Sequence, residues 1–138
     1  DVTYIHGEAE DLLPENKESF DVVTCLEAIE HVPDPQQLVK TCSDLCKPGG
    51  TIVFSTINRN PKSFLFAIIG AEYILNLLPK GTHEFKKFLK PSELSNMMRN
   101  SNLEVKEIIG MSYNPLTKKY WLGKDVDVNY MIHAEKSK

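Results

Sequence analysis

The chain has 138 residues, of which 41% are hydrophobic and 25% are charged, a composition typical of one ordinary globular domain rather than of a fibre or a disordered segment. Its 16 Lys and Arg against 19 Asp and Glu leave a net charge of −3, which lacks the basic excess of proteins that bind nucleic-acid phosphates. The three cysteines form no Cys-x-x-Cys pair and no signal-peptide pattern is present, so we expect a reducing, cytoplasmic-type compartment and no nucleic-acid partner.

Short apolar, β-branched runs alternate with helix-like stretches along the chain, and this alternation predicts an α/β sheet with mainly parallel strands. A helix over Gln36–Cys46 is predicted by the N-cap Asp34, by Pro35 at the first helical position and by the Lys-Pro-Gly-Gly run that follows it. A second helix begins at Pro91 and ends near residues 100–102. The predicted strands are Val2–His6, Phe20–Cys25, Thr51–Ile57, Leu103–Met111 and Asn129–Glu135.

Residues 64–78 are apolar nearly all round a helix but are too few for a membrane span, which needs about 20 residues. They lie in the most basic part of the chain, since six basic against two acidic residues between Arg59 and Lys90 give a local charge of +4. This pattern predicts a helix lying on a membrane surface or a lid over a lipid-like ligand. A buried helix or an oligomer contact remains an equal alternative.

The loop after the second predicted strand carries Glu27, Glu30 and His31, whose spacing would place two carboxylates and an imidazole on one side of a helical turn. Ligand sites of α/β sheets lie at the carboxyl ends of strands. Such a trio could hold a divalent metal or supply a general base, whereas on an arbitrary helix the same string is usually solvated charge.

Two cysteines, one histidine and the single tryptophan are also considered as functional residues. Cys42 and Cys46 fall on the apolar stripe of the first helix and are interpreted as small buried side chains. His83 lies beside the apolar segment and is a modest candidate for substrate contact. Trp121 is assigned to packing only.

Several motifs resemble class I S-adenosylmethionine-dependent methyltransferases, among them Gly-Glu-Ala-Glu-Asp-Leu at 7–12, Leu-Glu-Ala-Ile-Glu-His-Val-Pro-Asp-Pro at 26–35 and Lys-Pro-Gly-Gly at 47–50. The runs at 55–63, 70–75, 78–83, 87–94, 113–115 and 128–130 are narrower, and they resemble the bacterial ubiquinone-biosynthesis O-methyltransferase family. The resemblance implies a Rossmann-like methyltransferase sheet. It also implies methyl transfer from S-adenosylmethionine to a phenolic hydroxyl of a polyprenylated catechol-type intermediate such as demethylubiquinol.

The same resemblance implies roles for individual residues. A divalent metal ion, expected to be magnesium, would be held by Glu27, Glu30 and His31, with Glu30 and His31 as the catalytic residues. The cofactor S-adenosylmethionine would contact Leu26 at the strand end and the acidic turn at Glu8 and Ala9.

The resemblance also marks residues 62–84 as an insert that touches the membrane and the substrate tail. The implied partners are a polyprenylated quinol, an anionic membrane surface and other enzymes of ubiquinone synthesis, at the inner face of the bacterial inner membrane. The expected contact residues are Phe64, Ile68, Ile74, Leu78, Lys80 and His83.

The chain starts at Asp1 with a strand-like run, and no Gly-x-Gly follows a strand. Compared with the seven-stranded order of the family, the five predicted strands correspond to strands 3 to 7, so the chain is expected to be the C-terminal part of one methyltransferase domain. The alternative function is a non-catalytic lipid-binding or assembly module that keeps the methyltransferase-like sheet.

Overall fold

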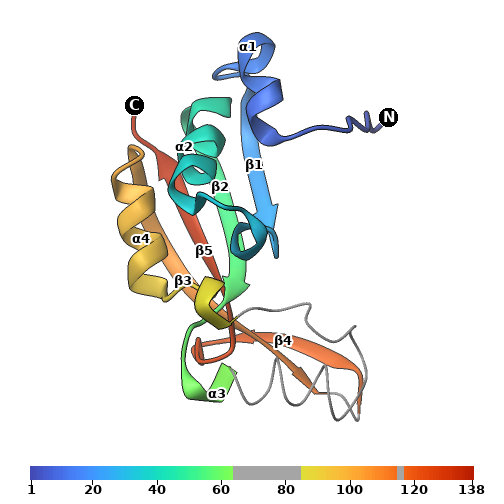
Figure 1. Ribbon diagram of the computed structural model, residues 1–138, viewed down its shortest axis with the longest axis vertical. Helices are drawn as coiled ribbons and strands as arrows, with labels where there is room; N and C mark the ends of the chain where they lie inside the picture. Colours follow the sequence, from blue (N-terminus) through green and yellow to red (C-terminus); the bar gives the residue numbers. More distant parts are fainter. Residues whose placement is uncertain (64–84, 115–116) are drawn as a thin grey trace.

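A five-stranded sheet runs through the centre of the computed structural model, which describes residues 1–63, 85–114 and 117–138 (Figure 1). The strand order in the sheet is β1-β2-β5-β3-β4, and β1 pairs parallel with β2. The strands are β1 (Phe20–Leu26), β2 (Cys46–Ile57), β3 (Leu103–Asn114), β4 (Lys119–Gly123) and β5 (Asn129–Lys136). Four of the five predicted strands are therefore confirmed, each with its start or end moved by a few residues.

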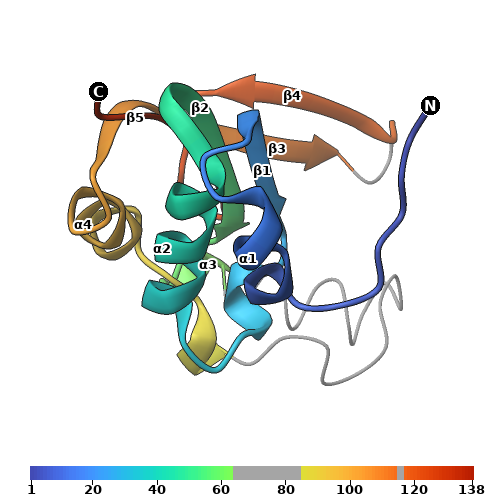
Figure 2. The ribbon, with the colours of Figure 1, turned by 90° about the horizontal axis from the view of Figure 1, so that it is seen from above.

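The helices α1, α2 and α4 all lie on one face of the sheet (Figure 2). The α-helices are α1 (Leu13–Asn16), α2 (Pro35–Leu45), α3 (Pro61–Ser63) and α4 (Pro91–Arg99), and the 3-10 turns are η1 (Ala9–Leu12), η2 (Ile29–His31) and η4 (Phe85–Lys87). Both predicted helices are confirmed.

The first of these, α2, forms for the reasons that its sequence suggests. The Asp34 carboxylate accepts a hydrogen bond of 3.0 Å from the Gln37 amide, and Pro35 occupies the first helical position, where its missing N–H is no loss. Its apolar stripe, which includes Val39 and Cys42, is buried against the sheet. Cys42 and Cys46 are 4% and 0% exposed, which confirms them as buried side chains.

The prediction of mainly parallel strands is wrong in one respect. Of the four strand pairings, only β1 with β2 is parallel, whereas β2 with β5, β3 with β5 and β3 with β4 are antiparallel. Of the paired strands that follow one another along the chain, β1 and β2 are joined by a helix, whereas four residues separate β3 from β4 and five separate β4 from β5. Connections of that length join antiparallel strands.

The prediction of a strand over Val2–His6 is also wrong. Residues 1–6 form no strand, and Val2, Tyr4 and Ile5 are 75%, 91% and 67% exposed. A strand needs a neighbour to pair its N–H and C=O groups, and among the described residues β1 hydrogen-bonds only to β2. A β-branched run without such a partner stays extended and irregular.

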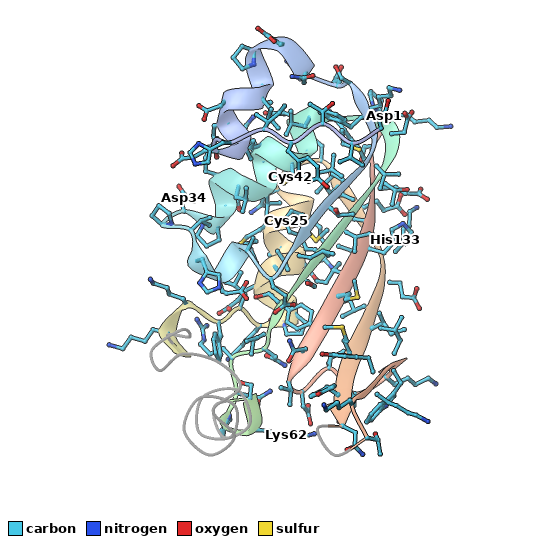
Figure 3. The ribbon with its side chains drawn as sticks, turned by 90° about the vertical axis from the view of Figure 1, so that its right-hand side faces the viewer. Asp1, Cys25, Asp34, Cys42, Lys62 and His133 are labelled. Atoms are coloured by element: carbon cyan, nitrogen blue, oxygen red, sulfur yellow. The ribbon has the colours of Figure 1, made fainter. Side chains whose placement is uncertain are left out.

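The hydrophobic core lies between the sheet and α2 and α4. Ile52 and Phe54 of β2 alternate with residues that point to the other face, and they meet Tyr130 and Ile132 of β5 in the core. Figure 3 shows His133 of β5 on the opposite face from the helices, as this alternation requires. The alternation along β2 and β5 thus determines which face of the sheet packs against the helices.

Two thiols meet between β1 and α2, where Figure 3 labels Cys25 and Cys42. A side-chain hydrogen bond joins them, which lowers the pKa of the Cys25 thiol below its ordinary value and, with burial, raises the pKa of the Cys42 thiol. Both cysteines are free thiols.

The expected membrane-contact residues Phe64, Ile68, Ile74, Leu78, Lys80 and His83 lie outside the described residues. Within residues 1–63, 85–114 and 117–138, no helix is long and apolar enough to cross a membrane.

We expect Tyr130→Phe to lower the free energy of unfolding by about 1–3 kcal/mol, because it leaves a buried carbonyl without its donor. The Tyr130 side chain is 0% exposed, and its hydroxyl donates a 2.9 Å hydrogen bond to the Leu89 carbonyl. Urea denaturation followed by circular dichroism measures the change. The matched control is Tyr4→Phe, which removes a hydroxyl from a side chain that is 91% exposed. Equal stability of the two variants would contradict this role of Tyr130.

Candidate functional site

The candidate site is the turn that follows β1. Glu27 stands directly after the strand with a φ of +51°, in the left-handed region that non-glycine residues seldom adopt. Its amide donates to both the carbonyl and the hydroxyl of Ser55, each at 3.1 Å. The Ser55 hydroxyl in turn donates to Oε1 of Glu27 at 2.7 Å. These bonds to β2 stabilise the strained residue and aim its carboxylate.

Glu30 lies on η2 and is buried, with 2% of its surface exposed. Thr56 donates a hydrogen bond of 2.8 Å from its hydroxyl to Oε2 of this carboxylate. Oε1 is buried and has no hydrogen-bond partner among the described residues. A buried carboxylate oxygen without a partner is costly unless a proton, a cation or a bound ligand satisfies it.

The prediction that Glu27, Glu30 and His31 share one helical turn is wrong. Because Glu27 has a left-handed backbone and Ala28 has a φ of −123°, the only helical residues here are Ile29–His31. His31 is exposed at the end of η2, whereas Glu30 points inward. Within the three described segments, no group of three His, Cys, Asp or Glu side chains is placed to hold a metal ion.

Glu27 and Glu30 are nevertheless both close enough to the buried Tyr130 hydroxyl to raise its pKa. Burial raises the pKa of the Tyr130 hydroxyl above its ordinary value, and the negative charges of Glu93, Glu30 and Glu27 raise it further. Tyr130 is also the β5 partner of Thr56 in the sheet. Glu27 and Glu30 therefore lie near the same end of the sheet as Thr56 and Tyr130.

Sequence reasoning missed the residues that hold this acidic pair. Ser55 and Thr56 are adjacent near the end of β2, so their side chains point to opposite faces of the sheet, and one holds Glu27 while the other holds Glu30. The available signal was a pair of hydroxyl residues ending a buried strand next to β1, because parallel neighbours bring their carboxyl ends together.

The expected cofactor contacts lie on two elements. Leu26 ends β1 and is 50% exposed, which gives an apolar surface beside the acidic pair. Glu8 precedes η1, and its amide is engaged by the Asp11 carboxylate at 2.9 Å, while Ala9 packs against the core. These residues offer an apolar contact at a strand end and an exposed carboxylate on the turn before η1.

Some of the basic residues between Arg59 and Lys90 are paired with carboxylates of the protein and are therefore not available to bind an anionic surface. Arg59 forms an ion pair with Glu93 on α4, and Lys62 forms ion pairs with Asp125 and Asp127, both at 3.0 Å. All three acidic partners lie outside residues 59–90: Glu93 is near the start of α4, and the two aspartates follow β4. At least two of the six cations that gave the local +4, Arg59 and Lys62, are therefore engaged in ion pairs among the described residues.

Comparisons with known proteins place this geometry in a family. Residues 2–108 match the sequence profile of a methyltransferase domain. The chain is 63% identical over 133 residues to a protein of Pseudomonas syringae pv. tomato named ubiquinone biosynthesis O-methyltransferase, covering 96% of this chain and 57% of that protein. It is 64% identical over 121 residues to the protein of the same name in Marinobacter nauticus, covering 88% of this chain and 51% of that protein. The chain thus spans about half the length of these curated relatives.

Solved structures agree on the fold. A structure from Thermotoga maritima, described as an S-adenosylmethionine-dependent methyltransferase and possible histamine N-methyltransferase, has a TM-score of 0.67 and 26% identity, covering 95% of this chain and 62% of that one. A putative methyltransferase from Bacillus halodurans has a TM-score of 0.64 at 16% identity, covering 99% of this chain and 78% of that one, and shows likeness of fold alone.

These matches confirm the resemblance drawn from the motifs. The sheet with its helices has the class I S-adenosylmethionine-dependent methyltransferase fold, and the acidic pair lies where such sheets bind their ligands. The chain belongs to the methyltransferase domain family.

Proposed function

We propose that the protein containing this chain is an O-methyltransferase of ubiquinone biosynthesis, which methylates a phenolic hydroxyl of a polyprenylated catechol-type quinol. The support from sequence is the 57–64% identity to bacterial proteins of that name. The observation in the structure that carries the chemistry is the buried Glu30 carboxylate, with one oxygen held by Thr56 and the other unpartnered among the described residues.

A phenol is a weak nucleophile near neutral pH, because its hydroxyl ionises only near pH 10. When bound, S-adenosylmethionine supplies an electrophilic methyl group. Glu30 is proposed to accept the phenolic proton at Oε1, while the Thr56 hydroxyl keeps Oε2 fixed. Glu27, held by Ser55, orients the second hydroxyl of the catechol, and Leu26 provides the apolar contact to the cofactor.

We also propose that a divalent metal ion, expected to be magnesium, binds at this site. Magnesium usually keeps several waters and takes only one or two carboxylates from a protein, so the ion would be held by Glu30 and waters, and Glu27 would reach it through a water from the other side of β2. With Oε1 unpartnered among the described residues, the charge of the Glu30 carboxylate is only partly satisfied, which supports a cation close to it rather than on the oxygen that accepts the proton. His31 remains part of the proposal through its place next to Glu30 on η2. The ion would lower the pKa of a bound hydroxyl.

Attachment to an anionic membrane surface is proposed for residues 62–84, as the sequence pattern suggests, with the enzyme peripheral at the inner face of the bacterial inner membrane. The apolar composition of residues 64–78 supports it. The role of Lys62 changes, because its ion pairs to Asp125 and Asp127 make it an anchor of the segment rather than a contact to lipid. Association with other enzymes of ubiquinone synthesis belongs to the same proposal.

The proposal predicts methyl transfer from labelled S-adenosylmethionine to a short-chain demethylubiquinol by the protein as the cell makes it. Glu30→Gln is expected to lower kcat by at least about 100-fold, because it removes the proton acceptor. The matched control is Glu15→Gln, an exposed carboxylate on α1, which leaves kcat unchanged. Absence of transfer by the unmodified protein with magnesium present would contradict the proposed function.

Thr56→Val tests the positioning of Glu30, since valine keeps the shape but leaves Oε2 without its donor. We expect kcat to fall about tenfold with little change in KM, because a loosely held carboxylate is seldom aligned with the phenol. Thr56→Ser should restore most of the rate. Ser95→Ala removes a buried hydroxyl in α4 and serves as the control for stability. If valine and serine have equal rates, the hydroxyl does not position Glu30.

Metal binding is tested without activity, by titrating manganese as a paramagnetic substitute for magnesium and measuring free ion by electron paramagnetic resonance. Glu30→Gln is expected to weaken binding about tenfold or more, because an oxygen ligand with charge is lost. Glu15→Gln again serves as the control. Unchanged manganese affinity in Glu30→Gln would remove the metal from the site.

A further inference from the structure

The β3–β4 hairpin exposes an unusual amount of apolar surface. Tyr120, Trp121 and Leu122 of β4 are 68%, 51% and 57% exposed. Tyr113 of β3, itself 38% exposed, stacks on Tyr120 with ring centroids 4.4 Å apart. The packing role predicted for Trp121 from the sequence is therefore incomplete, since about half of this side chain is open to solvent. Exposed aromatic and aliphatic side chains gathered on one element in this way point to an interaction surface.

These side chains cover both faces of the hairpin. Successive residues of a strand point to opposite sides, so Trp121 faces away from its neighbours Tyr120 and Leu122. Among the described residues β4 pairs only with β3, at the edge of the sheet farthest from β1. A partner that presents one rigid surface would cover only one of the two faces. A medium that surrounds the hairpin would cover both.

The basic charge of the hairpin indicates that the surrounding medium is an anionic one. Residues 117–124 contain three lysines and no acidic residue. Lys118, Lys119 and Lys124 form no ion pair within the described part of the chain, whereas the nearby Asp125 and Asp127 are both engaged by Lys62. Trp and Tyr are the side chains enriched at the headgroup level of membranes, and lysines beside them are attracted to anionic lipid.

The hairpin is also fixed next to the start of the apolar segment. Lys62 bonds the carboxylates of Asp125 and Asp127, and the Asn60 side chain donates to the Asp127 carbonyl at 2.6 Å. Figure 1 shows β4 and α3 at the same end of the molecule. The loop that follows β4 thus ties the hairpin to the residues that lead into the segment after Ser63.

We propose that the β3–β4 hairpin is a membrane-contact element that seats Tyr120, Trp121 and Leu122 at the headgroup level of an anionic bilayer. The proposal rests on the membrane attachment in the proposed function and adds a surface that lies some 40 residues further along the chain. A second copy of the chain is the competing occupant. It is disfavoured by charge, because each copy would bring three lysines and no carboxylate from residues 117–124.

The test uses the fluorescence of Trp121, which is the only tryptophan in the 138 residues. The whole protein is mixed with vesicles of phosphatidylglycerol or of phosphatidylcholine, with bromine atoms placed high on the acyl chains as quenchers. Trp121→Phe gives the background from any other tryptophan. With the phosphatidylglycerol vesicles, we expect the emission of Trp121 to move to shorter wavelength and to be quenched by bromine. With the phosphatidylcholine vesicles, we expect neither change.

Charge variants test the lysines. Lys118→Gln with Lys119→Gln is expected to weaken vesicle binding about tenfold or more, given the contribution of each lysine near an anionic surface. Lys17→Gln with Lys138→Gln makes the same change in net charge at two exposed positions away from the hairpin and should weaken binding far less. Methyl transfer to a short-chain, water-soluble quinol should be unchanged in both, which separates this proposal from the proposed function.

Two results would overturn the proposal. One is flotation of the protein with phosphatidylglycerol vesicles while Trp121 emission stays unshifted and unquenched, which would assign binding to another surface. The other is a blue shift that depends on protein concentration without vesicles, which would assign the hairpin to contact between copies. Ile74→Asp, in the segment 62–84, tests the other proposed membrane surface, and its effect on flotation is compared with that of the lysine variants.

Discussion

The pairing of two hydroxyls with two carboxylates is the interaction on which the site depends. Ser55 and Thr56 stand side by side on β2, and the alternation of a strand sends one to each face, where they hold Glu27 and Glu30. Parallel pairing of β1 with β2 makes this possible, because it brings the end of β1 beside these hydroxyls, with Leu26 opposite Ser55. An antiparallel neighbour would have presented its beginning instead.

Glu30 shows how stability and chemistry compete at this place. A buried carboxylate with one hydrogen-bonded oxygen and one unpartnered oxygen destabilises the fold on its own. Ile29, the neighbour of Glu30 on η2, and Phe54 of β2 are fully buried, so the carboxylate is set into the apolar core. Natural proteins leave a buried polar atom unsatisfied mainly at functional positions. We therefore expect a bound ligand to supply the missing partner of this oxygen. The unsatisfied atom and the proposed proton acceptor are the same oxygen.

The sequence predicted those features that depend on local chemistry. The cap at Asp34 and the apolar stripe of α2 are local, and both are as expected. Val2–His6 failed because a strand depends on a partner that a run of β-branched residues cannot reveal. The spacing of Glu27 and Glu30 predicted their proximity but not their geometry, because spacing assumes a helix and Glu27 has a left-handed backbone. The contacts from Ser55 and Thr56 join residues 26 and 28 positions apart, and no local pattern encodes them.

Hydrogen bonds and ion pairs link the site to the opposite edge of the sheet, where β4 lies. The strand that holds Glu30 through Thr56 continues directly into residues 58–63, and Asn58 donates its side-chain amide to the Val126 carbonyl at 2.9 Å. Arg59 is paired with Glu93 on α4, and Lys62 is paired with Asp125 and Asp127 beyond β4. A short stretch of β2 and its extension thus connects the acidic pair to the base of the hairpin. The function proposed above would require such a connection, because the reacting hydroxyl would have to reach Glu30 while the tail of the substrate stays in lipid. The ion pairs of Arg59 and Lys62 therefore serve to position residues 58–63, and in the proposal made above it is the lysines of the hairpin that contact lipid.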